Sequence, residues 1–138
     1  MNKILIVHTS WYSEYIDEMI QIATNVISES KYEYETTCAP GAIELAALGK
    51  YYLIKNESSF YSGILFLGIV IRGETTHYDL VINEAFRSIG DLALNYPNIS
   101  VINNVLCVEN SDQLIKRLKI NTKNNTQALI ELINEKSS

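Results

Sequence analysis

The segment Arg72-Gly73-Glu74-Thr75-Thr76-His77 carries residue types that suit an anion site beside a proton-transfer group. A glycine, two hydroxyls and the free backbone N–H groups of a helix start are the parts of a phosphate site. His77 is one of two histidines in the chain, and imidazole exchanges protons readily near neutral pH. The competing interpretation is a threonine N-cap followed by a histidine without a chemical role.

A second polar cluster is Pro40-Gly41-Ala42-Ile43-Glu44, which combines a rigid turn, a glycine and a carboxylate at a helix start. The N–H groups of a first helical turn can hold a polar ligand. Glu44 either accepts hydrogen bonds from ligand hydroxyls or only complements the helix dipole. Trp11, the sole tryptophan, either stacks on a planar heterocycle or packs against a neighbouring element or subunit.

Arg117, Lys116 and Lys119 form a small basic cluster in a chain whose net charge is −5. Such a cluster suits one phosphate group, whereas the alternative is a cation that stabilises the end of a short helix. The excess of acidic residues excludes a general binder of nucleic acid or anionic membranes. Cys38 and Cys107 lack a second ligand at metal-binding spacing, so no metal site is expected, and both thiols are expected to be reduced and buried.

Alternating strand and helix patterns must position these residues. The expected strands cover residues 4–7, 32–38, 60–71 and 100–108. The expected helices cover residues 12 to about 30, 42 to about 55, 81–96, 111–118 and 125–135. Alternation predicts a three-layer α/β/α fold with a four-stranded parallel sheet, in which ligands bind at the carboxyl ends of the strands. The 138 residues fit one domain, spanning 1–138.

Hydropathy favours a cytoplasmic protein. The first apolar run, Ile4 to Val7, has four residues, fewer than the roughly 7–15 of a signal-peptide core. The run from Gly63 to Ile71 has nine residues, whereas a membrane-spanning helix needs about 20. The sequence therefore predicts neither export nor membrane insertion.

Two motifs resemble the lumazine synthase family. They are Pro40 to Leu45 and the longer, more specific run from Leu67 to Glu84. Ser10-Trp11-Tyr12 and the segment from Val108 to Arg117 also match, so the resemblance covers nearly the whole chain in order. It implies a flavodoxin-like parallel sheet and a soluble enzyme of riboflavin biosynthesis.

The resemblance implies a condensation that uses no metal and no organic cofactor. The implied substrates are 5-amino-6-(D-ribitylamino)uracil and 3,4-dihydroxy-2-butanone 4-phosphate. The implied product is 6,7-dimethyl-8-ribityllumazine, formed with release of phosphate and water in the penultimate step of the pathway. These small molecules and further copies of the chain are the expected partners.

Site roles follow from the same resemblance. Trp11 would stack on the pyrimidine, and Ala42 with Glu44 would contact the ribityl chain. Val70 and Ile71 would offer backbone groups to the ring. The implied catalytic residues are His77, for proton transfer, and Arg117, for phosphate and supplied by a neighbouring subunit. The implied substrate-binding residues are Trp11, Gly41, Ala42, Ile43, Glu44, Val70, Ile71, Gly73, Glu74, Thr75, Thr76, Asn103 and Arg117.

Several positions depart from the family pattern. Asn103-Asn104 stands where many members have Phe-Gly, which predicts weaker binding of flavin-like rings. Ile43 replaces a frequent phenylalanine, which removes another aromatic ring without disturbing backbone contacts. Asn125 takes the place of a lysine, which predicts weaker phosphate binding. Because the segment from Lys119 to Asn124 lacks the glycine-containing turn of shell-forming members, a free homopentamer is expected rather than an icosahedral shell of sixty subunits.

Other functions fit parts of the pattern. A lumazine or flavin carrier on the same scaffold would not need both His77 and Arg117. A flavodoxin-like electron carrier needs a glycine and dense hydroxyls after the first strand, which the run from His8 to Tyr12 lacks. A purely structural shell protein would not need the segment from Arg72 to His77.

Overall fold

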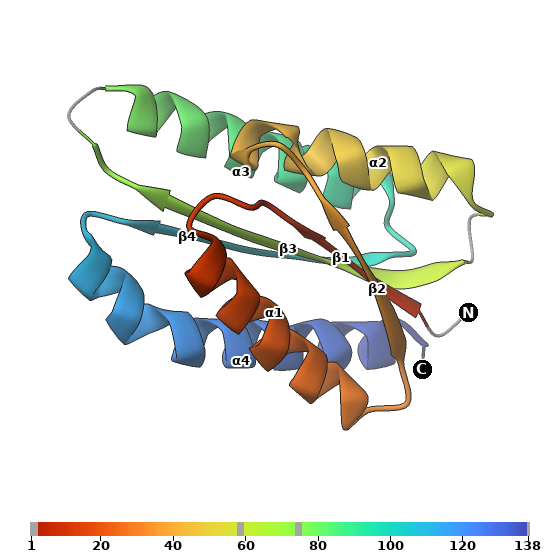
Figure 1. The fold of residues 1–138 in the computed structure, drawn as a ribbon. Helices are drawn as coiled ribbons and strands as arrows, with labels where there is room; N and C mark the ends of the chain where they lie inside the picture. Colours follow the sequence, from red (N-terminus) through yellow and green to blue (C-terminus); the bar gives the residue numbers. More distant parts are fainter. Residues whose placement is uncertain (1–2, 58–59, 74–75, 138) are drawn as a thin grey trace.

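The computed structural model describes residues 3–57, 60–73 and 76–137. Its elements follow one another as strand and helix in alternation (Figure 1). In chain order they are β1 (Lys3–His8), α1 (Ser13–Ser28), β2 (Glu33–Cys38), the 3₁₀ turn η1 (Ala42–Glu44), α2 (Leu45–Lys55), β3 (Tyr61–Ile71), α3 (His77–Asn95), β4 (Ser100–Val108) and α4 (Ser111–Ser137).

The four strands form one parallel sheet in the order β2-β1-β3-β4. Figure 1 shows α1 and α4 on one face of this sheet and α2 and α3 on the other. The expected three-layer α/β/α architecture is therefore confirmed. The chain moves outward from β1 first to β2 and then, in the other direction, to β3, so a crevice opens between the carboxyl ends of β1 and β3.

Continuous apolar runs make β1 and β3 the centre of the sheet, because strands covered on both faces have no polar side. Residues 4 to 7 of β1 are fully buried, and their side chains alternate between two cores. Ile4 and Ile6 pack with α1 and α4, whereas Leu5 and Val7 pack with α2 and α3. These two cores fix the sheet between its helical layers.

The prediction of two short terminal helices is wrong, because α4 is one helix of 27 residues. Asparagine costs under about 1 kcal/mol in a helix interior, and no glycine or proline interrupts the run from Ser111 to Ser137. Two of the buried positions are threonines, so the helical periodicity of buried residues cannot be seen from the apolar residues alone. The residues that α4 buries are Leu114, Leu118, Thr122, Thr126, Leu129 and Ile133.

Side-chain hydrogen bonds tie the middle of α4 to β4. Asn104, 1% exposed, donates from Nδ2 to Thr122 Oγ1 at 3.0 Å and accepts from Asn125 Nδ2 at 2.6 Å. The Thr126 hydroxyl donates to the carbonyl of Thr122 at 2.7 Å. These bonds satisfy polar groups inside the core and hold the asparagine-rich stretch in the helix.

Cys38 is exposed at the end of β2, so the prediction that both thiols are buried is wrong for Cys38, whose strand lies at the sheet edge. Cys107 is half-buried. As for membrane insertion, none of the helices within the described ranges is long and apolar enough to span a bilayer.

Candidate active site

A pocket of about 390 Å³ lies where β1, β2 and β3 end, within the size range of small-molecule sites. It brings together side chains from the loops after β1 and β2, the end of β3 and the first turns of α3. The lining residues are Trp11, Tyr12, Pro40, Gly41, Ala42, Ile43, Glu44, Ile69, Val70, Ile71, His77 and Val81. Eight of these twelve belong to the expected site: Trp11, Gly41, Ala42, Ile43, Glu44, Val70, Ile71 and His77.

The loop after β1 forms one wall. Trp11 Nε1 donates a hydrogen bond to the carbonyl of Pro40 at 3.0 Å, which ties this loop to the loop after β2. The indole stays 65% exposed, so a ring face is free to meet a planar ligand. Tyr12 has left-handed backbone angles of φ 59° and ψ 53°, a strained conformation for a residue with a side chain. Such strain is typical of functional loops.

The loop after β2 supplies the carboxylate. Gly41 is extended, and the N–H of Glu44 donates to the carbonyl of Gly41 at 3.2 Å. A Cβ at position 41 would lie 2.9 Å from Glu44 Oε1, so glycine lets the carboxylate fold over the backbone. Glu44 also stands at the N-cap position of α2 without a side-chain capping bond there. Its place suits both a ligand contact and the helix dipole.

The end of β3 forms the floor. Pairing with β1 ends where the N–H of Thr9 donates to the carbonyl of Leu67, but β3 continues to Ile71 beside β4 alone. Backbone groups of alternate residues point to the same side of a strand. The groups of Ile69 and Ile71 therefore face the open side, whereas those of Val70 face β4.

His77 is the first residue of α3 and lines the pocket with an exposed side chain. Thr76, at the N-cap position, makes no side-chain capping bond to the described part of the helix, which argues against the simple N-cap interpretation. Gly73 is exposed, and a Cβ there would meet nothing within 4 Å. The expected contacts of Glu74 and Thr75 fall outside the described residues.

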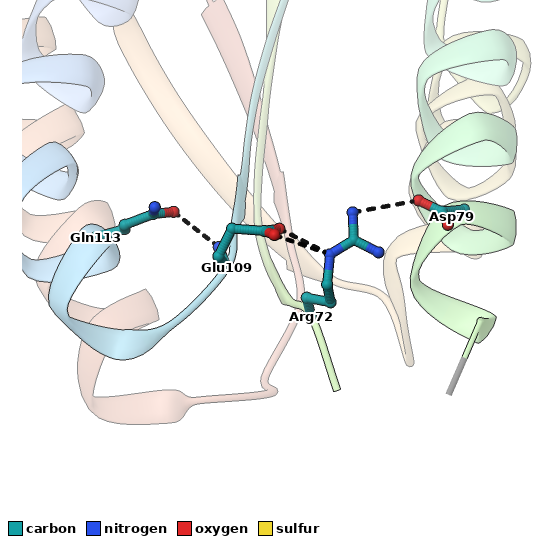
Figure 2. A network of polar contacts seen from close by, with 4 residues as sticks. All are labelled: Arg72, Asp79, Glu109 and Gln113. Carbon is teal, nitrogen blue, oxygen red and sulfur yellow. Dashed lines mark hydrogen bonds and ion pairs between the residues drawn. The ribbon is translucent and has the colours of Figure 1, made fainter. Parts of the chain in front are cut away.

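A polar network lies beside the start of α3 (Figure 2). Arg72 Nε donates to both carboxylate oxygens of Glu109, at 3.1 and 2.8 Å, and Nη2 lies 3.5 Å from Asp79 Oδ1. The hydrogen bond from Arg72 to Glu109 raises the pKa of the guanidinium. The guanidinium carbon also lies 4.3 Å from the centre of the Tyr78 ring. The sequence alone assigned no role to Arg72 or Glu109.

Arg117 and Asn103 do not line this pocket. Arg117 is exposed on α4, across the sheet from α3. Because α4 continues to Ser137, Arg117 is not near a helix C-terminus, and the interpretation as an end-of-helix cation is wrong. Lys119 lies two residues on, nearly opposite Arg117 on the helix, so the two do not form one phosphate cradle. Asn103 Oδ1 accepts from the N–H of Val105 at 2.9 Å.

Four lining residues were missed from the sequence. Tyr12 and Pro40 adjoin predicted residues, Ile69 lies two before Ile71, and Val81 is one helical turn after His77. Loop adjacency and helical spacing were thus the signals available for finding them.

The electrostatics of the pocket are incomplete for a phosphate ligand. Its ionisable lining side chains are Glu44, His77 and Tyr12. Neither lysine nor arginine is among the described lining residues. In the described ranges no group of three or more histidine, cysteine, aspartate or glutamate side chains is placed to hold a metal ion. A phosphate here would therefore need a cation from outside this pocket.

An open parallel sheet with a pocket at the point where its strand order reverses is the architecture of a doubly wound α/β protein, and this is the position at which proteins of that class bind ligands. The family model described as 6,7-dimethyl-8-ribityllumazine synthase matches residues 1–137. The chain belongs to the 6,7-dimethyl-8-ribityllumazine synthase family, which confirms the resemblance.

Similar curated proteins carry the same name. The 6,7-dimethyl-8-ribityllumazine synthase of Bartonella bacilliformis is 36% identical over 121 residues, covering 88% of this chain and 78% of the relative. That of Zymomonas mobilis is 36% identical over 124 residues, covering 90% and 86%. That of Agrobacterium fabrum is 34% identical over 122 residues, covering 87% and 82%.

Proposed function

We propose that this chain condenses 5-amino-6-(D-ribitylamino)uracil with 3,4-dihydroxy-2-butanone 4-phosphate to give 6,7-dimethyl-8-ribityllumazine, phosphate and water. The observation that carries the proposal is the pocket that gathers Trp11, Glu44, Ile71 and His77 from four separate segments in a chain of this family. An aromatic face, a carboxylate, free strand backbone and an imidazole match the chemical groups of these substrates.

The pyrimidine would lie between Trp11 and the free edge of β3. The exposed indole offers a stacking face, and the backbone groups of Ile69 and Ile71 offer a donor and acceptor pattern to the ring. In this proposal the backbone groups of Ile69 and Ile71 contact the ring, whereas Val70 contributes only its side chain. Glu44 would accept hydrogen bonds from ribityl hydroxyls at the opposite wall.

The reaction needs an amine to add to a ketone, followed by loss of water, elimination of phosphate and ring closure. His77 would move protons in these steps, because it lines the pocket beside the proposed ring site. Holding two reactants together lowers the barrier by roughly 7–11 kcal/mol. His77 therefore assists the reaction without being indispensable.

The phosphate cation would come from a second copy of the chain. The family resemblance assigns this cation to Arg117 of a neighbouring subunit, and the absence of lysine and arginine from the described pocket lining supports that assignment. We propose a homopentamer in the cytoplasm, without the sixty-subunit shell, formed from the single domain of residues 1–138. Exposed apolar side chains on α3, Leu80 at 65% and Leu94 at 82%, support burial against another copy.

The test mixes purified protein with both substrates and follows the lumazine chromophore. We expect turnover by the parent, slower but measurable turnover by His77→Ala, and a raised KM for the butanone phosphate in Arg117→Ala. Lys3→Ala serves as control, since this lysine pairs with Glu35 at the start of β1, at the opposite edge of the sheet from the pocket. No turnover together with tight lumazine binding would instead identify a carrier.

A subunit-mixing experiment tests the shared site. Co-refolded His77→Ala and Arg117→Ala chains would create some sites with both residues intact, so activity should exceed the average of the two pure variants. Activity equal to that average would refute the contribution from a neighbour. Light scattering of the parent tests the pentamer, and a particle near sixty subunits would refute it.

A further inference from the structure

We propose that Arg72 is a positioning residue that holds the first turn of α3, and with it His77, against the ends of β3 and β4. The proposal rests on the proposed function, in which His77 transfers protons. Figure 2 shows the guanidinium between the carboxylates of Glu109 and Asp79, which come from opposite sides of it.

The contacts bracket the start of the helix. Arg72 follows β3 directly, and its N–H donates to the carbonyl of Val108 at 2.9 Å, which fixes its backbone to β4. Its side chain then reaches two consecutive residues of α3, the ring of Tyr78 at 4.3 Å and the carboxylate of Asp79 at 3.5 Å. Since adjacent helical residues share one rigid backbone, holding residues 78 and 79 also holds the backbone of His77 in place beside the pocket.

Glu109 gives this arrangement a second anchor. The bond from Arg72 Nε reaches both of its carboxylate oxygens, and the N–H of Glu109 donates to Gln113 Oε1 at 2.8 Å in the first turn of α4. The guanidinium thereby connects the end of β3, the end of β4 and the start of α3. A single flexible side chain could not impose this geometry without the anchor at Glu109.

The chemistry favours arginine in this role. A planar guanidinium can hydrogen-bond a carboxylate along its edge while its face lies on an aromatic ring, whereas an ammonium group is a point charge. The local charge also argues against direct phosphate binding by Arg72, because one positive group faces two negative ones. Positioning is the role that its partners support.

The start of α3 needs such support. Thr76 makes no side-chain capping bond with the described residues of the helix, although N-cap side chains commonly satisfy the first free N–H groups. The backbone bond from the N–H of Asp79 to the carbonyl of Thr76 is long, at 3.3 Å. A guanidinium cannot accept from these N–H groups, so Arg72 supports the first turn through its contacts with the Tyr78 ring and the Asp79 carboxylate instead.

The test compares Arg72→Met and Glu109→Gln with Lys3→Met as a matched control. Lys3 also pairs with a carboxylate and an aromatic ring, Glu35 at 3.9 Å and Phe60 at 5.1 Å, but it stands at the start of β1, at the opposite edge of the sheet from His77. We expect kcat to fall about 10- to 100-fold in Arg72→Met, as for a displaced catalytic group, and to stay within about twofold in Lys3→Met. Glu109→Gln should lie between them, and it serves if Arg72→Met fails to fold.

A double variant separates positioning from a general structural role. If Arg72 acts through His77, Arg72→Met combined with His77→Ala should be no slower than His77→Ala alone. Multiplied losses in the double variant, or unchanged kcat in both Arg72→Met and Glu109→Gln, would overturn the proposal. A loss of kcat in Lys3→Met as large as in Arg72→Met would overturn it as well.

A spectroscopic arm needs no substrate. His8→Gln leaves His77 as the one imidazole in the chain, so its NMR signal can be followed directly. In that background Arg72→Met should shift or broaden the signal, whereas Lys3→Met should leave it unchanged. A parent that makes no lumazine refutes the proposed function, while an unmoved imidazole signal in Arg72→Met refutes the positioning role by itself.

Discussion

Replacing Asn104 with leucine removes two hydrogen bonds that join β4 to α4. Asn104 donates to Thr122 Oγ1 and accepts from Asn125 Nδ2, and the side chains of Asn104 and Thr122 are almost fully buried. Leucine keeps a similar size but cannot serve either partner. We therefore expect a marked loss of folding stability without loss of the fold.

The magnitude follows from the burial of the two groups left behind. Thr122 is 0% exposed, and a buried polar group without its partner costs about 1–3 kcal/mol. Asn125 is half-buried, so water can replace its lost partner, and the cost is nearer the roughly 0.5–1.5 kcal/mol of an ordinary hydrogen bond. Together they predict a destabilisation of about 2–4 kcal/mol.

The assay is urea unfolding followed by far-UV circular dichroism at fixed protein concentration, because self-association also stabilises the native state. The double variant Asn104→Leu/Thr122→Val replaces both partners of one bond with apolar groups. It should cost less than the sum of the two single variants by about 1 kcal/mol or more. The reasoning would be refuted if the free energy of unfolding of Asn104→Leu lay within about 0.5 kcal/mol of that of the parent, or if the losses of the two single variants added strictly in the double variant.

Three further predictions follow from burial. Gly63→Ala should cost about 1–3 kcal/mol in urea unfolding, because its Cβ would lie 2.8 Å from Ile133 Cδ1; an unchanged midpoint would contradict this. A maleimide near pH 8 should label Cys38 faster than Cys107, since burial raises the pKa of the Cys107 thiol to about 11; equal rates would argue otherwise. Burial is the larger cause and the hydrogen bond to a carboxylate the smaller cause that raise the pKa of Tyr61. The unfolded state therefore loses this proton at a lower pH than the folded state, and the free energy of unfolding should fall above about pH 10. Tyr61→Phe should flatten that fall in unfolding curves, and parallel curves would count against it.

The candidate site was largely predictable because it follows the ends of the strands. Apolar runs located β1 and β3, and the loops after them had to meet at one edge of a parallel sheet. Trp11, Glu44 and His77 are therefore brought together as expected. Their proposed roles came from the family motifs, which run in order along the chain.

The sequence by itself determined the alternation of strands and helices, the bounds of β4 and the family of the protein, since these depend on local periodicity and on runs of neighbouring residues. Only the tertiary structure decided that α4 is continuous, because the buried Thr122 finds its hydrogen-bond partner, Asn104, on β4. It likewise paired Arg72 with Glu109, 37 residues away, and left the end of β3 without a neighbour on the β1 side. Such pairings arise from packing between distant segments, which no local pattern records.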